Sequence, residues 1–120
     1  MSAAKIYTFL REAARVYSVA SLFNVEYAAP DSDVLPSDVA IDRDGILRVA
    51  FASSASGVLR AKLTRGGATV VVDYNAGAPL AANALYAFDL PVKKGDYFNL
   101  RYSAAGRVLY CEVQLLAMPI

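Results

Sequence analysis

The chain has 120 residues, which is enough for one domain with one hydrophobic core. Its 12 basic and 11 acidic residues are interspersed and leave a net charge of +1, so no basic patch indicates nucleic-acid binding. The sequence has no histidine and a single cysteine, Cys111. Histidine-based catalysis, zinc sites built on histidine and several cysteines, and an internal disulfide are therefore excluded within one chain.

The apolar content is high for so short a chain. Hydrophobic residues make up 57% of the sequence and charged residues 19%, which is more apolar than an average soluble domain. Either the surface is unusually apolar, or part of it is covered by copies of the chain or by a partner. No apolar run approaches the roughly 20 residues that span a bilayer, and charged residues interrupt any signal-peptide core near the N-terminus. We therefore expect neither a signal peptide nor a membrane partner.

Residues 3–23 have the periodicity of an amphipathic helix, with Ser2 as a candidate N-cap. Apolar side chains recur there at three- and four-residue spacing, and no Gly or Pro interrupts them. We predict an N-terminal helical arm over residues 1–23 and a β-domain over residues 24–120. The apolar stripe packs either on the chain's own sheet or on neighbouring subunits; a membrane-surface role is disfavoured because the polar face is not notably basic. If the helix packs on neighbouring subunits, the expected interface residues are Ile6, Phe9, Leu10, Val16, Tyr17 and Phe23.

After a Pro-containing loop at residues 28–38, the pattern changes to a period of two. Six alternating segments follow, separated by Gly-containing turns at roughly ten-residue spacing. Two shorter strands are expected at residues 23–27 and 39–41. Eight strands without intervening helices predict an antiparallel β-sandwich or jelly-roll-like barrel. The six alternating segments centre on Val49, Ala61, Val72, Phe88, Leu100 and Val113.

The second half of the chain carries an ordered series of features. A loop at residues 75–77 is followed by an Ala-rich segment and an aromatic strand at residues 81–90, a Pro-Val-x-x-Gly-Asp turn at residues 91–96, and a strand with Asn and Arg at residues 97–102. On these features, residues 45–116 resemble the jelly-roll or tumour-necrosis-factor-like modules that decorate phage and archaeal-virus capsids or tip their fibres. The resemblance implies a virion location, a capsid or fibre protein as partner, and no catalytic residues.

One acidic turn has the spacing of a metal site. Asp42 and Asp44 alternate before Gly45, as carboxylates do at the start of a calcium loop. The later ligands of such a loop are missing, so we favour a hairpin turn and predict no metal and no cofactor. Cys111 falls on the apolar phase of the last strand, which favours a buried small side chain over a reactive thiol.

Tyr97 and Tyr110 lie on the phase opposite the core residues of their strands, and exposed tyrosines are common at protein interfaces. Together these patterns predict a non-enzymatic structural or assembly protein that forms a homo-oligomer, a trimer or higher. The resemblance implies that this protein belongs to a virion, for capsid decoration or an auxiliary role. The alternative is a module that binds glycans or peptides, which would need a concave strip of aligned Tyr and Asn side chains. An enzyme would need a deep pocket that holds two carboxylates.

Overall fold

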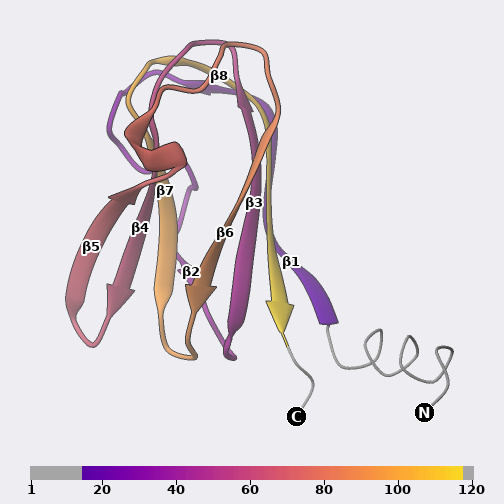
Figure 1. Cartoon of the computed structure of the whole chain (residues 1–120), viewed down its shortest axis with the longest axis vertical. Helices are drawn as coiled ribbons and strands as arrows, with labels where there is room; N and C mark the ends of the chain where they lie inside the picture. Colours follow the sequence, from indigo (N-terminus) through magenta and orange to yellow (C-terminus); the bar gives the residue numbers. More distant parts are fainter. Residues whose placement is uncertain (1–14, 118–120) are drawn as a thin grey trace, which may run out of the picture.

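The computed structural model describes residues 15–117, which form eight strands in two antiparallel sheets (Figure 1). Sheet A has the strand order β1-β8-β3-β6, and sheet B has the order β2-β7-β4-β5. A 3-10 turn at Asn75–Gly77 lies between β5 and β6. The strands are β1 (Arg15–Tyr27), β2 (Val39–Ala40), β3 (Gly45–Ser53), β4 (Leu59–Arg65), β5 (Ala68–Asp73), β6 (Tyr86–Val92), β7 (Tyr97–Tyr102) and β8 (Gly106–Ala117).

The strand pairing is that of one long hairpin rolled into two layers. β1 pairs with β8, β2 with β7, β3 with β6, and β4 with β5, all antiparallel. Two further pairings, β3 with β8 and β4 with β7, complete the sheets. Eight strands arranged in this way form a jelly roll. The predicted mainly β, antiparallel sandwich is therefore confirmed for the part of the chain that the structure describes.

The predicted helix over residues 3–23 is wrong for residues 15–23, which form the first part of β1; residues 3–14 lie outside the described residues. β1 runs through the expected domain boundary after residue 23. A β-bulge between Ser18 and Ala20 explains the misleading pattern. The extra residue shifts the alternation, so that Tyr17 and Ala20, three residues apart, both lie on the face toward sheet B. A bulged strand thereby acquires the spacing of a helix.

The core lies between the inner faces of the two sheets. β3 contributes alternate residues from Leu47 to Phe51, and β8 contributes alternate residues from Cys111 to Leu115, all fully buried. They meet the inner side chains of β4 and β7. Sheet B contributes Leu59, Ala61, Phe98, Leu100 and Tyr102, which are buried too.

Two valines on the inward phase of an alternating segment are exposed. Val70 and Val72 are 55% and 45% exposed, although their partners in β4 lie on the inner face. β5 is the outermost strand of sheet B, and Figure 1 shows the β4–β5 hairpin standing apart from the strands of sheet A. The alternation correctly predicts which face these valines occupy, but not that sheet A fails to cover that face.

Candidate functional site

The outer face of sheet A carries an apolar row that crosses all four strands at one end of the sheet. Val16 of β1 lies opposite Leu116 of β8, Leu116 lies opposite Ile46 of β3, and Ile46 lies opposite Pro91 of β6. Val16 is 59% exposed, and Ile46 is exposed as well. Side chains directly opposite one another in neighbouring strands touch, so these four residues form one continuous apolar strip, called here the first apolar row.

A second apolar row crosses the other end of the same face. Phe23 lies opposite Tyr110, and Tyr110 lies opposite Ala52. Leu85 directly precedes β6 and adds a further exposed apolar side chain. Phe23 is 77% exposed, which is unusual for a Phe in a regular strand. Together the two rows make the outer face of sheet A a candidate contact surface.

Polar side chains separate the two rows. Arg48 and Asp89 form a bidentate ion pair, with N–O distances of 2.9 and 3.0 Å, and Ser18 donates a hydrogen bond to Glu112. The face therefore has apolar ends and a polar middle. Ion pairs of this exposed kind contribute little to folding, but they limit which partner side chains can lie over the centre of the face.

The outer face of sheet B is of the opposite character, because acidic residues of the loop at residues 28–38 reach over its basic side chains. Asp31 accepts from Arg60 at 2.8 Å, and Asp33 accepts from Arg101 and Lys62 at 3.2 Å each. Asp73 of β5 also accepts from Arg60, at 2.9 Å. These basic side chains are thus already paired, and the face around them is mainly polar and charged.

A buried amide holds this loop in place. Asn99 is 1% exposed, and its Oδ1 accepts from the backbone N–H of Leu35 at 3.0 Å and of Leu100 at 2.7 Å. Its Nδ2 donates to Asp38 at 2.9 Å and to the carbonyl of Leu35 at 3.3 Å. All four hydrogen-bonding positions of the amide are used. This side chain is therefore structural, and it determines where the acidic loop lies.

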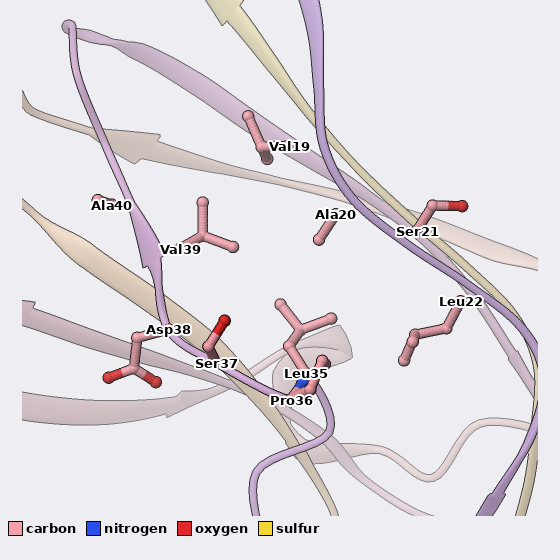
Figure 2. Close-up of a pocket in the computed structure, with 10 residues that line it drawn as sticks. All are labelled: Val19, Ala20, Ser21, Leu22, Leu35, Pro36, Ser37, Asp38, Val39 and Ala40. Carbon is pink, nitrogen blue, oxygen red and sulfur yellow. The ribbon is translucent and has the colours of Figure 1, made fainter.

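A cavity of about 490 Å³ lies between β1 and the segment that leads into β2 (Figure 2). Figure 2 shows mainly apolar side chains around it, including those of Leu22, Leu35 and Val39, with Asp38 at its rim. Asp38 is the one charged residue of the lining and is already engaged by Asn99. Because the one carboxylate of the lining is hydrogen-bonded to Asn99, the cavity does not offer the two titratable groups that serve as general acid and general base.

The acidic turn at Asp42 and Asp44 serves the fold. Asp44 Oδ1 accepts from the backbone N–H of Lys94 at 2.8 Å, which ties this turn to the turn between β6 and β7. Asp42 is paired with Arg43 at 3.6 Å. Within residues 15–117, no group of three or more acidic or cysteine side chains is placed to hold a metal ion.

The predicted interface residues separate onto different faces. Val16, Phe23 and Tyr110 all lie on the outer face of sheet A, with Val16 at one end and Phe23 beside Tyr110 at the other. Tyr17 lies on the inner side at the end of the sheet, where it accepts a hydrogen bond from Arg43 at 3.0 Å. Tyr97 lies on sheet B and is 50% exposed. Ile6, Phe9 and Leu10 lie outside the described residues.

Sequence reasoning missed four members of the surface. Two of them have a signal that could have revealed them: Ile46 and Leu116 are apolar residues next to a core residue, on the phase that should be polar. An apolar residue on the solvent phase of a strand is informative because it needs another reason to be there. The missed residues are Ile46, Leu85, Pro91 and Leu116.

Two buried side chains with reactive groups show no catalytic arrangement. Burial, followed by the charge of Glu112, raises the pKa of Cys111 to about 12, so the thiol is protonated at neutral pH. Burial also raises the pKa of Tyr74, whose ring stacks on Phe88 with centroids 4.9 Å apart. The Tyr74 hydroxyl has no hydrogen-bond partner among the described residues. Neither group lies beside a base that could activate it.

No protein-family model and no curated protein sequence matches this chain. Among solved structures, it is similar to the C-terminal domain of A223, a structural protein from Sulfolobus turreted icosahedral virus, with a TM-score of 0.49 and 16% identity over 88% of this chain and 100% of that one. It is also similar to a Podospora anserina GH26-CBM35 β-(1,4)-mannanase, with a TM-score of 0.39 and 12% identity over 92% of this chain and 28% of that one. The first neighbour is a viral structural protein. At these TM-scores neither likeness indicates a function for this chain. Within the described residues, no helix is long and apolar enough to cross a membrane.

Proposed function

We propose that this protein is a non-catalytic structural module that self-associates through the outer face of sheet A. The observation that carries the proposal is the pair of apolar rows on that face, centred on Val16 with Ile46 and on Phe23 with Tyr110. Interface cores are enriched in aromatic and aliphatic residues and depleted of charge. The outer face of sheet B lacks this character, since its basic residues are ion-paired.

The exposed area supplies a driving force. A phenylalanine buries roughly 150–250 Å² when it is fully covered, and Phe23 leaves 77% of its surface exposed. At roughly 25 cal/mol per Å², covering this side chain alone contributes about 3–5 kcal/mol before the cost of ordering. Aromatic anchors of this size commonly dominate the binding energy of an interface.

The resemblance of residues 45–116 to capsid-decorating and fibre-tip modules supports a virion setting for this self-association, with the protein as a decoration or auxiliary component. In that setting the same face would also be available to a capsid or fibre protein. The alternative of a glycan-binding strip finds no support in the described residues. Tyr97 and Tyr110 lie on different sheets, and Asn99 is buried.

The test is the mass of the full chain by sedimentation velocity across a concentration series. Ile46→Lys puts a charge into the first apolar row at a position that is 42% exposed, and it should shift the protein toward monomer. Tyr97→Lys is the matched control, because Tyr97 is 50% exposed but lies on sheet B. Equal masses for wild type, Ile46→Lys and Tyr97→Lys at every concentration would refute the proposal.

A further inference from the structure

The two sheets have four edge strands, and three of them carry features that block the addition of another strand. β1 has the bulge after Ser18 and a left-handed residue, Asn24, with φ of 52°. β6 contains Pro91, which has no N–H to donate, and β2 is only two residues long. These devices are the usual protection of a free sheet edge.

β5 has no such protection. It runs through six residues, Ala68–Asp73, without proline, glycine or a bulge, and all six are exposed. Three consecutive valines occupy its centre, and its one charged residue is at its end. Short segments of high β-propensity and low charge are the segments that pair with other strands when their edge is open. Figure 1 shows β5 at the outside of the molecule.

The register between β5 and β4 determines which backbone N–H and C=O groups of β5 point outward. Tyr74 N–H donates to the carbonyl of Leu59 at 2.9 Å. Hydrogen-bonded pairs alternate along an antiparallel ladder, so Val72 and Val70 also bond to β4. The N–H and C=O groups of Thr69, Val71 and Asp73 therefore point away from β4. No described residue makes a backbone hydrogen bond to these groups.

We propose that β5 pairs antiparallel with β5 of a second copy, about a two-fold axis through Val71. This inference rests on the proposed function for self-association, which makes a second copy the occupant, and not for the contact through sheet A. In this register Val71 bonds to Val71 of the second copy, and Thr69 bonds to Asp73 of the second copy on each side. Three pairs with two bonds each satisfy all the outward groups of both strands. The two four-stranded sheets B join into one continuous sheet.

The side chains fit the same register. Val70 lies opposite Val72 of the second copy, so four half-exposed valines gather on the face toward sheet A. On the other face, the Asp73 carboxylate lies opposite the Thr69 hydroxyl of the second copy and not opposite another carboxylate. Like charges directly opposite one another destabilise a strand pair, and this register has none. Because each copy uses the same edge, the contact closes at two copies and does not propagate as a fibre.

Position 69 gives a matched pair of variants for the test. In the isolated chain Thr69 lies opposite Thr64, a neutral residue, so Thr69→Lys and Thr69→Glu should affect folding similarly. In the paired state the new lysine meets Asp73 of the second copy, and the new glutamate meets a like charge. Sedimentation should show roughly tenfold tighter dimerisation for Thr69→Lys than for Thr69→Glu. Equal dimerisation by the two variants would overturn the proposal.

Mixing provides a second test that is specific to the axis at Val71. Val71→Lys and Val71→Glu should each fail to pair with themselves, whereas an equimolar mixture should form a heterodimer. Amide exchange should show the same contact in the wild type, because Thr69, Val71 and Asp73 gain protection with concentration while Val70 and Val72 are protected throughout. A mixture that behaves as the sum of its components would overturn the inference.

The two association surfaces are tested independently. If the position-71 variants leave the mass unchanged while Ile46→Lys lowers it, the edge pairing is wrong and the proposed function stands. If the position-71 variants lower the mass while Ile46→Lys does not, the edge pairing stands and the contact through sheet A is wrong. If both lower it, each chain has two separate contacts, and the assembly is larger than a dimer.

Discussion

Replacing Asn99 with alanine should destabilise the fold more than its size suggests. The substitution removes only a small amide, but the amide is buried and makes four hydrogen bonds. Three of the groups it satisfies belong to the loop, namely the N–H and C=O of Leu35 and the Asp38 carboxylate. Leu35 is itself 2% exposed, so water cannot readily replace the lost amide.

The magnitude follows from the groups left without partners. A buried donor or acceptor that loses its partner costs about 1–3 kcal/mol. Three buried groups lose their partner, namely the N–H and C=O of Leu35 and the N–H of Leu100, while Asp38 can reach water. The free energy of unfolding should therefore fall by at least about 3 kcal/mol. Since one kcal/mol shifts the midpoint of a domain of this size by about 3–5 °C, we expect the thermal midpoint to fall by roughly 10–15 °C.

Urea unfolding of wild type and Asn99→Ala at pH 7 measures this difference. Thr64→Ala is a suitable control, because it removes a side-chain hydrogen bond to Thr69 on the exposed surface of a neighbouring strand. It should cost less than about 1 kcal/mol. If Asn99→Ala unfolds within 1 kcal/mol of the wild type, then this amide does not hold the acidic loop, and the account of the sheet B face fails with it.

Three further predictions concern stability and reactivity. The hydrogen bonds from Arg65 hold the pKa of Asp96 below its usual value. The stability that Asp96 contributes is therefore present above the unfolded pKa of roughly 3.9 and is lost as pH falls through the folded pKa. In urea unfolding, the stability advantage of wild type over Asp96→Asn should shrink below about pH 4, and a constant advantage would contradict this. The Cys111 thiol is buried, and its pKa is raised to about 12. At pH 8 it should react with a thiol reagent only as fast as the protein unfolds. Immediate reaction would show that the thiol is accessible in the folded protein. A chain that starts at Asn24 lacks most of β1 and should be unfolded by circular dichroism, because β8 loses one of its two antiparallel neighbours along eight residues, 110–117; a folded truncation would show that β1 is dispensable.

Most of the β-domain could be predicted from the sequence, because it depends on local alternation and on turn residues. The alternation of Leu47, Val49 and Phe51 with smaller or polar residues identifies an inward face without any knowledge of the partner strand. Gly66 and Gly67, with φ of 57° and 81°, form the tight hairpin turn that their sequence indicates.

The N-terminal part could not be predicted in the same way. The bulge after Ser18 breaks the period of two, and what remains over residues 15–23 matches a helical period. A bulge depends on the partner strand as much as on the bulged one, and β8 lies some 90 residues away in sequence. Local pattern therefore indicated the apolar residues correctly and assigned them the wrong element.

The candidate surface could be predicted only in part from the sequence, for a related reason. Exposure of Phe23 and Tyr110 can be suspected from phase, but their adjacency depends on the β1–β8 register. The exposure of Val70 and Val72 depends on how far sheet A extends over β5, which no local pattern records. Registers and sheet overlap are long-range properties, and they determine which apolar residues form a surface.

The most direct test of contact through sheet A is the solvent accessibility of the Ile46 methyl group during association. A soluble paramagnetic agent broadens the signals of exposed methyl groups, and Ile46 is 42% exposed in the isolated chain, whereas Ile41 is 3% exposed and serves as the internal reference. As the concentration and the mass of the wild-type protein rise, the broadening of Ile46 should fall toward that of Ile41. If the mass rises while Ile46 remains as accessible as in the monomer, the outer face of sheet A is not the contact surface.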